Sequence, residues 1–385
     1  MTADAPASDL STRFNALGQW LKGRFIERDD TVDAALCALV AGQHVLLVGP
    51  PGTAKSQLAA GLCDAIEGAQ RFQWLLTRFT TPEELFGPVS LKSLEIDRYQ
   101  RLTAGKLPES HVVFLDEVFK ASSAILNTLL TVLNERKFHN GLEAQPVPLL
   151  TLFGAANELP EDDDLLALYD RFLVRLVVDY VEEDFRFLKL LGLDGQADDP
   201  PALTLDEIHQ AQADAQTLDV PQDVLYDVVA LRAGLKERGI TVSDRRWRQC
   251  LGLMRAQAWL QGRPQVSSTD LRVLRHTLWS SPDERDEVKA ALDQIIDGEL
   301  SELRRLVAQA REIHTYPERY DDDDARARAA LEALTKLKAL ARAASEIADR
   351  ARRRGRDPYA IKQAVDEIVR LRDVVARAHL KEPLQ

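Results

Sequence analysis

The chain has 385 residues, 45% of them hydrophobic and 29% charged, with a formal net charge of −12. Its length predicts two or three domains, and its acidic balance disfavours broad nucleic-acid binding. The three widely spaced cysteines fit neither a disulfide framework nor a zinc motif. No apolar run is long enough for a membrane span, and the polar start does not have the pattern of a secretory signal. We therefore expect a cytoplasmic protein.

From residue 11 to residue 190, apolar runs alternate with amphipathic segments, which predicts an α/β fold with a parallel sheet. Thr31 can cap a helix that runs to Ala41, where Gly42 ends it. Further helices are expected at 55–67, 121–134 and 182–191, and strands at 44–49, 71–76, 111–116, 149–157 and 174–181.

The segment LLVGPPGTAKSQL (46–58) follows a strand, precedes a helix and has the spacing of a phosphate-binding loop. In the pattern G-x-x-x-x-G-K-[ST], backbone N–H groups cradle phosphates, the lysine reaches the β and γ groups, and the hydroxyl binds magnesium. Ala54 replaces the glycine before the lysine; its methyl costs little with helical dihedrals and is harmful only if φ must be positive. The alternative is a structural Gly/Pro turn. The residues expected to bind ATP are Gly49, Pro50, Pro51, Gly52, Thr53, Ala54, Lys55, Ser56 and Gln57.

A second motif, HVVFLDEV, places Asp116 and Glu117 at the end of an expected strand. Acidic residues often end strands, but an acidic pair about 60 residues after a phosphate loop suits phosphoryl transfer. We expect Asp116 and Ser56 to hold Mg²⁺ and Glu117 to polarise the attacking water.

Asn157 closes the apolar strand TLFGAA. A polar residue at this position can be a turn former. Beside the strand that ends in Asp116 and Glu117, its amide could instead hold the attacking water next to the γ-phosphate. We favour the second interpretation.

A Gly/Pro/Asp-rich segment at 192–204 predicts a domain boundary, and no strand is expected after it. Four helices are expected at 205–217, 221–238, 244–261 and 268–279. The remaining segment is rich in Ala, Arg and Leu, and its apolar stripes predict helices at about 285–314, 325–352 and 358–380 that pack on one another.

The order of these motifs resembles the AAA+ ATPases and, more narrowly, the MoxR group and its RavA-like branch. GPPGTAKS, with alanine before the lysine, is similar to the loop that this group favours. The segments at 114–141, 156–176 and 242–247 are also close to the RavA-like pattern. The resemblance covers roughly residues 10–280 and implies that the loop is a family variant.

The resemblance implies an AAA+ αβα core with a parallel sheet at 1–192, a four-helix lid at 204–281 and a C-terminal helical arm, similar to a three-helix bundle, at 283–385. It assigns Asn157 as sensor 1. The resemblance also assigns two arginines, each with a second arginine as an alternative. Arg171 matches the finger that reaches a neighbouring subunit, with Arg175 as a stand-in, and Arg245 matches sensor 2, although Arg246 adjoins it. Without the resemblance, Arg171 could form a salt bridge to Asp170 and Arg245 could be an ordinary helix-end cation.

The function implied by this resemblance is a ring-forming, hexameric ATPase that uses ATP and Mg²⁺ to remodel or mature a protein partner, with a von Willebrand factor A domain protein as the expected partner. A nucleic-acid motor and a chelatase or rubisco-remodelling motor are the alternatives. Residues 325–356 hold ten basic and three acidic residues, a local balance of +7, which is the feature that favours nucleic acid.

Two segments fit insertions of this branch. Residues 87–110 alternate like a hairpin, and residues 137–150 suit a second hairpin with Asn-Gly at its tip. Such hairpins face the ring pore or, alternatively, cap sheet edges. RavA-like proteins often carry a β-rich module after the lid, whereas this chain stays helical, so the basic segment and the arm are the candidate client-binding regions.

Overall fold

The computed structural model describes residues 9–160, 162–192, 199–320, 322–353 and 358–379. The chain forms two compact units. Unit one comprises Met1–Val220, Ile240–Val266 and Val273–Arg285, and unit two comprises Pro221–Gly239, Ser267–Arg272 and Asp286–Gln385. The three-part division into core, lid and arm remains a prediction.

Unit one is built on a five-stranded, all-parallel sheet with the strand order β3-β4-β7-β1-β8. Since the strands are parallel, all their carboxyl ends lie at one edge, which is where ligands bind in open α/β sheets. This carboxyl edge holds the ends of β1, β4 and β7. The strands are β1 (Val45–Val48), β3 (Arg71–Leu75), β4 (Val112–Asp116), β7 (Thr151–Ala156) and β8 (Val174–Val177).

Helices cover both faces of this sheet. On one face, α6 and α7 pack against alternate side chains of β1, β4 and β7 in a buried cluster that includes Leu46, Val113 and Leu152. On the other face, α3 contacts β4 and α2 contacts β8. The helices of this region are α1 (Asp9–Arg24), α2 (Asp29–Val40), α3 (Lys55–Asp64), α4 (Pro82–Phe86), α6 (Ser123–Glu135), α7 (Asp163–Tyr169) and α8 (Asp184–Leu191).

The α/β class and the five expected strands are confirmed, but some boundaries differ. Thr31 is buried inside α2, which begins at Asp29, so it is not the cap. Gly42 follows the helix end with φ 63°, as expected. Helix α3 ends at Asp64, and β2 (Ile66–Glu67) then pairs with β9 (Leu203–Thr204), a two-residue strand at the end of the expected boundary segment 192–204.

The two insertions differ in regularity. Lys137–Pro146 form the expected antiparallel hairpin of β5 (Lys137–Asn140) and β6 (Glu143–Pro146). The first insertion has only an isolated Val89–Arg101 bridge and the one-turn helix α5 (Leu91–Leu94). The buried Asn140 side chain joins them, since it accepts from Arg101 N–H at 2.6 Å and donates to Arg101 C=O at 3.1 Å.

After the sheet, unit one adds α9 (Leu205–Thr217) and α11 (Asp244–Leu260), which pack on α2 and on each other. The expected helix at 268–279 is a 3₁₀ segment, η3 (Ser268–His276). Helix α10 (Gln222–Glu237) belongs to unit two.

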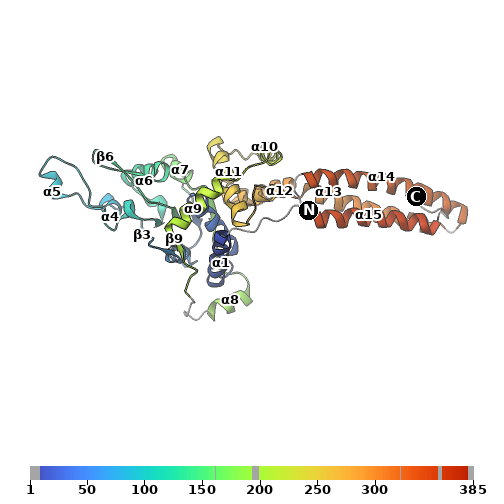
Figure 1. Ribbon diagram of the computed structural model, residues 1–385, viewed down its shortest axis with the longest axis horizontal. Coiled ribbons are helices and arrows are strands. Elements are labelled where there is room, and N and C mark those ends of the chain that lie inside the picture. Colours follow the sequence, from blue (N-terminus) through green and yellow to red (C-terminus); the bar gives the residue numbers. More distant parts are fainter. Residues whose placement is uncertain (1–8, 161, 193–198, 321, 354–357, 380–385) are drawn as a thin grey trace. The chain divides into compact units, whose positions relative to one another are not determined.

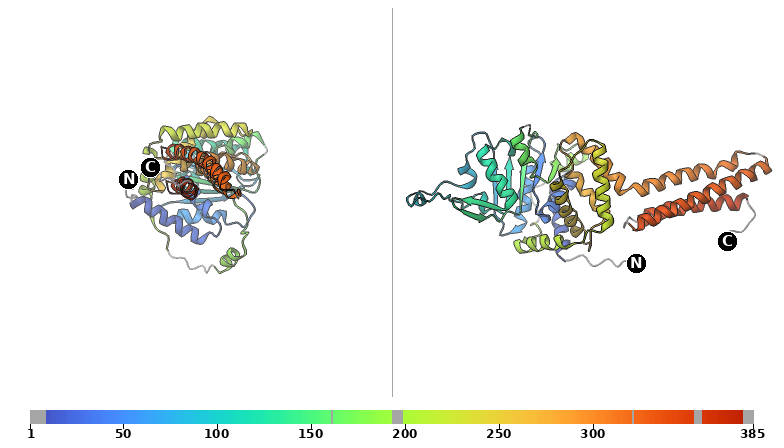
Figure 2. Two further views of the ribbon diagram at one scale, coloured as in Figure 1. Left: turned by 90° about the vertical axis from the view of Figure 1, so that its right-hand side faces the viewer. Right: turned by 90° about the horizontal axis from the view of Figure 1, so that it is seen from above.

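Unit two is helical in its described part. After α12 (Arg285–Ile296), the helices α13 (Gly298–His314), α14 (Asp323–Arg353) and α15 (Pro358–His379) lie side by side (Figures 1 and 2). Their buried faces form one apolar cluster, which confirms the expected packing. Leu331, which belongs to the apolar stripe expected at 325–352, is instead 58% exposed. A single helix was expected at 285–314; it breaks at Asp297 before Gly298. Within the described ranges, no helix has the length and apolar character needed to span a bilayer.

Candidate functional site

The loop between β1 and α3 is shaped by backbone packing. The Gly49 N–H donates to the Ala156 carbonyl of β7 at 3.0 Å. A Cβ at Gly49 would lie 2.1 Å from the Val178 carbonyl oxygen, so no larger residue fits there. Gly52 has φ 79° with open space around it, so glycine is favoured here because of its backbone conformation and not because a side chain would clash. These contacts hold the loop open at the carboxyl edge of the sheet.

Ala54 adopts a left-handed conformation, with φ 64° and ψ 22°. The positive φ is the case in which the Ala54 methyl is unfavourable, since a left-handed non-glycine residue costs about 1–2 kcal/mol. Glu117, the second residue of the acidic pair, is also left-handed, with φ 52°. Strained backbone of this kind is concentrated at functional sites.

Lys55 begins α3 and folds back over the loop. Its Nζ donates to the carbonyl oxygens of Gly49 and Pro50, each at 2.7 Å, and the residue is only 8% exposed. Burial lowers the pKa of Lys55, and the nearby charges of Asp116 and Glu117 oppose that shift. Both hydrogen-bond partners of the Lys55 ammonium group are neutral carbonyls. The ammonium group could therefore leave these carbonyls for an incoming phosphate, because a hydrogen bond to a charged acceptor is stronger.

The acidic pair and Asn157 meet beside this loop. Asp116 ends β4 and accepts the Glu117 N–H at 3.0 Å. Asn157 follows β7, the neighbour of β4, and its amide donates to Glu117 Oε1 at 2.7 Å. Lys120 approaches Glu117 Oε2 to 3.3 Å. Asn157 therefore contacts the expected base directly, and a second group holds the other carboxylate oxygen.

A cavity of about 280 Å³ brings these groups together. Ser56 and Asp116 supply a hydroxyl and a carboxylate, which are hard oxygen ligands of the type that Mg²⁺ takes together with substrate phosphates and water. No cluster of three or more His, Cys, Asp or Glu side chains suited to a metal occurs in the described ranges. The cavity lining is Pro51, Gly52, Thr53, Ala54, Lys55, Ser56, Gln57, Phe114, Asp116, Glu117 and Asn157.

The predicted arginines lie at the opposite, amino edge of the sheet. Arg171 is three residues before Val174, which pairs with Val45 at the first position of both strands. Arg245 begins α11 and donates to Asn134 Oδ1 at 2.7 Å, at the end of α6. Strand β1 alone separates the two edges by about 13 Å, and neither arginine lines the cavity.

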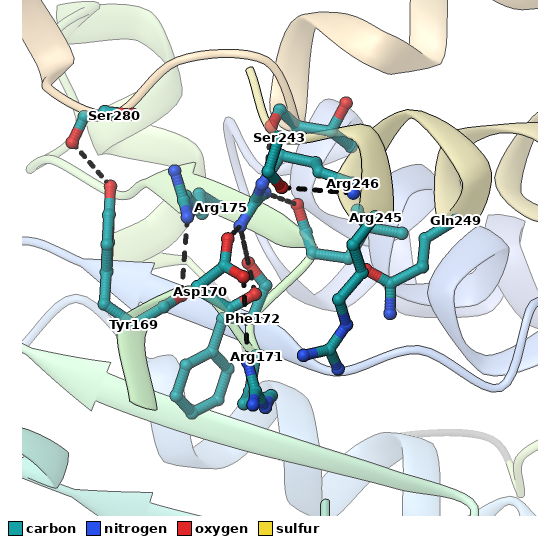
Figure 3. A network of polar contacts seen from close by, with 12 residues as sticks. Tyr169, Asp170, Arg171, Phe172, Arg175, Ser243, Arg245, Arg246, Gln249 and Ser280 are labelled. Carbon is teal, nitrogen blue, oxygen red and sulfur yellow. Dashed lines mark hydrogen bonds and ion pairs between the residues drawn. The ribbon is translucent and has the colours of Figure 1, made fainter. Parts of the chain in front are cut away.

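Arg171 and Arg245 form an incompletely paired cationic site (Figure 3). Arg171 lies 3.7 Å from Asp170, and its Nε is buried with no hydrogen-bond partner among the described residues. Burial and the charge of Arg245 lower the pKa of Arg171. The ion pair considered as the alternative for Arg171 is therefore present, but at a distance typical of a weak contact.

The neighbouring arginines have structural contacts. Arg246, only 4% exposed, donates to the carbonyls of Leu173, Thr277 and Phe172 and to both carbonyl and carboxylate of Asp170. Arg175 lies 3.7 Å from the Tyr169 ring centre and donates to Trp279 C=O, and burial lowers its pKa to about 9. Both guanidinium groups are enclosed, so they cannot reach another chain in this conformation.

Two residues near the site were not anticipated from the sequence. Lys120 is the ion-pair partner of Glu117, and its i,i+3 spacing in FLDEVFK was the available signal. Tyr180 donates its hydroxyl to the Pro51 carbonyl at 3.3 Å and so ties the segment after β8 to the phosphate loop. No local pattern marks Tyr180, because its contact depends on the pairing of β1 with β8.

Comparison with known families gives two matches. A profile described as the MoxR domain in the MoxR-vWA-beta-propeller ternary systems matches residues 12–216, and an AAA lid domain profile matches residues 223–292.

Individual proteins are also similar. The uncharacterized protein MJ0812 of Methanocaldococcus jannaschii is 39% identical over 301 residues, which cover 74% of this chain and 80% of that protein. Protein MoxR of Paracoccus denitrificans is 25% identical over 337 residues, covering 76% and 96%. A crystal structure described as a candidate ATPase from Cytophaga hutchinsonii aligns with a TM-score of 0.60 at 14% identity, covering 74% of this chain and 94% of that chain, and supports the fold alone.

Proposed function

The chain belongs to the MoxR family of AAA+ ATPases, and on that premise we propose that it hydrolyses ATP to drive the remodelling or maturation of a protein partner. The observation that carries this proposal is the convergence of Lys55, Asp116, Glu117 and Asn157 on one cavity at the carboxyl edge of the sheet.

The residues of this cavity have distinct roles in the proposed reaction. The loop N–H groups and Lys55 bind and neutralise the phosphates, and Glu117 orients water and accepts its proton. Asn157 fixes the carboxylate of Glu117 through their 2.7 Å hydrogen bond. Ser56 and Asp116 are the residues that would hold Mg²⁺, which when bound neutralises charge on the β and γ phosphates. Most of the catalytic effect in such a site comes from positioning and electrostatics.

We further propose that the active unit is a ring of copies, as the hexamer implied by the resemblance. Arg171 and Arg245 are on the amino edge, away from their own cavity, which supports a role for both at a neighbour's γ-phosphate. Helix α8 also supports assembly, because it buries none of its residues. Five of its apolar side chains are 39–68% exposed: Phe185, Phe187, Leu188, Leu190 and Leu191. Apolar surface of this kind marks interaction sites.

The proposed partner is a protein with a von Willebrand factor A domain. The matched family profile is described by systems that combine MoxR, vWA and β-propeller proteins, and this description supports the choice. Assignment to the RavA-like branch stays a proposal, as does a cytoplasmic site of action. The described cysteines are all buried free thiols, which fits a reducing compartment. A chelatase or rubisco-remodelling motor would use the same ATPase domain to act on a different client.

The nucleic-acid alternative loses support from the arm. Five basic residues of the basic segment have acidic partners nearby, in the ion pairs Arg326–Asp323, Lys336–Glu332, Arg342–Glu346, Arg350–Glu302 and Arg352–Asp349. Glu332, Glu346 and Asp349 are already counted in the local balance of +7, and Asp323 and Glu302 lower it to +5, which weakens the attraction of this segment for a phosphate backbone.

Glu117→Gln tests the proposed function. We expect this variant to bind ATP as the wild type does, because the phosphate loop is intact, but to release no phosphate. Lys55→Ala should weaken ATP binding, and Glu143→Gln, which changes an exposed carboxylate of β6, should alter neither property. Isothermal titration and phosphate release separate these outcomes, and wild-type turnover by Glu117→Gln would remove Glu117 from its assigned role.

A further inference from the structure

A second cavity, of about 510 Å³, lies near the same carboxyl edge of the sheet, next to the acidic pair. Two cations, Arg78 and Lys120, line it together with Phe119 and Ser123, and Asp162 is its acidic member. The phosphate loop contributes nothing to this Arg78–Lys120 cavity, so it is separate from the ATP cavity.

Arg78 lies on a turn that is held by its own side chains. The Thr77 N–H donates to Thr80 Oγ1 at 2.8 Å, the Thr80 N–H donates to Thr77 C=O at 3.1 Å, and the Phe79 N–H donates to Thr77 Oγ1 at 3.2 Å. Thr80 is buried, whereas Arg78 is exposed and Phe79 is 91% exposed. The turn therefore presents a cation and an aromatic ring to solvent from a fixed backbone, a combination that is enriched at protein interfaces.

Lys120 connects this cavity to the catalytic carboxylate. Its Nζ lies 3.3 Å from Glu117 Oε2, and its side chain is 54% exposed while that of Glu117 is 19% exposed. A lysine that remains this open to water forms a weak ion pair, so a second carboxylate arriving from solvent can compete for it.

We propose that the Arg78–Lys120 cavity binds an acidic segment of the protein client, and that a client carboxylate draws Lys120 away from Glu117. This proposal rests on the proposed ATPase function. With Lys120 engaged by the client, Glu117 keeps its hydrogen bond from Asn157 and its second oxygen becomes available to water. Client binding is thereby coupled to hydrolysis.

The lining favours a protein carboxylate over a phosphate ligand. Arg78 and Lys120 provide two positive charges and Asp162 in the same wall removes one, so the cavity matches one singly charged carboxylate of an acidic segment better than the doubly charged group of a phosphate. The exposed ring of Phe79, beside Arg78, offers a contact for apolar residues that flank an acid in a peptide.

Binding can be tested without nucleotide, so that its failure is distinct from failure of the proposed ATPase. The probe is a fluorescein-labelled peptide of about ten glutamates, titrated with the full chain and followed by anisotropy, with an oligo-glutamine peptide as the neutral control. We expect Arg78→Ala and Lys120→Ala each to weaken glutamate-peptide binding about tenfold, the usual effect of losing one charge-assisted hydrogen bond. Arg328→Ala removes an exposed cation of the arm and should bind as the wild type does.

Hydrolysis supplies the second readout. The glutamate peptide should raise the ATPase rate of the wild type, whereas Lys120→Ala should have a raised rate without peptide and no further response. Lys120→Arg should restore both restraint and response, because it keeps the charge. Equal peptide binding by wild type, Arg78→Ala and Lys120→Ala would overturn the proposal, as would a peptide that binds without changing the rate.

Two other outcomes separate the alternatives. If the wild type does not bind the peptide and the Arg78→Ala variant has a lower sedimentation coefficient than the wild type, the cavity holds a carboxylate of a neighbouring copy. That result would overturn the client assignment. If peptide binding follows the expected order but no form of the protein releases phosphate, the cavity is supported as an acidic-peptide site, and the coupling fails together with the proposed ATPase.

Discussion

The carboxyl edge of the sheet and its amino edge differ in what their charged side chains contact. At the carboxyl edge, Glu117 is held by Asn157 at 2.7 Å and by Lys120 at 3.3 Å, next to Asp116. At the amino edge, Arg171 and Arg245 lie near each other with few acidic partners, and their mutual repulsion contributes to the lowered pKa of Arg171.

The charges of the two edges are therefore complementary: the carboxyl edge is acidic, and the amino edge has cations with few acidic partners. Among the described residues, Lys55 is the one cation that lines the cavity of the carboxyl edge, and the two arginines of the amino edge do not line it. In the proposed ring, one copy's amino edge would lie against another copy's carboxyl edge in a head-to-tail contact.

The largest expected effect comes from Arg171→Ala. If Arg171 acts on a neighbour, its removal should lower kcat by about 10³–10⁵-fold, the usual worth of an arginine finger. ATP binding should be retained because the phosphate loop is unchanged. Phosphate release across a protein concentration series should also show wild-type specific activity rising with oligomer content. An Arg171→Ala enzyme with full activity, or flat specific activity in the wild type, would contradict the trans arrangement.

The pair Arg245 and Arg246 offers a matched comparison one residue apart. Arg246→Ala leaves buried carbonyls and Asp170 without their donor and should reduce the free energy of unfolding by about 3–5 kcal/mol. Arg245→Ala changes an exposed side chain and should cost less than about 0.5 kcal/mol but lower kcat about 10²-fold. Urea unfolding and phosphate release measure the two effects. The reverse pattern would assign sensor 2 to Arg246.

Acid should weaken the scaffold of the amino edge through His44. This fully enclosed imidazole accepts the Leu152 N–H at Nδ1 (3.0 Å), and burial, then Arg136, holds its pKa well below 6.5. Below about pH 6.5 the unfolded chain takes up a proton that the folded chain refuses, so stability falls as pH falls, by up to about 1.4 kcal/mol per pH unit. His44→Asn keeps an acceptor and should remove this slope, whereas His139→Asn, at an exposed position, should not. Urea titrations from pH 7 to pH 4.5 measure it; an unchanged slope in His44→Asn would exclude His44 as the cause.

The smallest expected effect is at the phosphate loop. Ala54→Gly removes left-handed strain of about 1–2 kcal/mol, partly offset by the greater freedom of glycine in the unfolded chain. We expect a net stabilisation of about 0.5–1 kcal/mol. Ala60→Gly, in the interior of α3, should destabilise by about 1 kcal/mol. Thermal unfolding compares them, and a loss of stability in Ala54→Gly would show that the methyl contributes more contact energy than its backbone costs.

The sequence predicted those features that depend on local pattern. The order of strands and helices, the phosphate loop and the position of Asp116 and Glu117 at a strand end follow from periodicity and spacing. The juxtaposition of Asn157 with Glu117 was also predictable, because parallel neighbouring strands end at the same edge.

Other features depend on contacts between distant segments. Ala54 has a positive φ in a loop whose first residue, Gly49, is held by β7, and no residue type in the sequence indicates that φ. Arg245 and Arg246 differ only by the rotation of one helix residue, so burial alone distinguishes them. The exposure of α8 could not be predicted either, since its apolar residues have the pattern of a buried helix.

Mixing two inactive variants tests the division between edges most directly. Glu117→Gln has an intact amino edge and Arg171→Ala an intact carboxyl edge, so each alone should be inactive. In a mixed assembly at equal amounts, about a quarter of the contacts join an intact Glu117 to a neighbour's intact Arg171. Phosphate release from the mixture should therefore recover to about a quarter of the wild-type rate. A mixture that co-assembles yet stays inactive would contradict a site shared between copies.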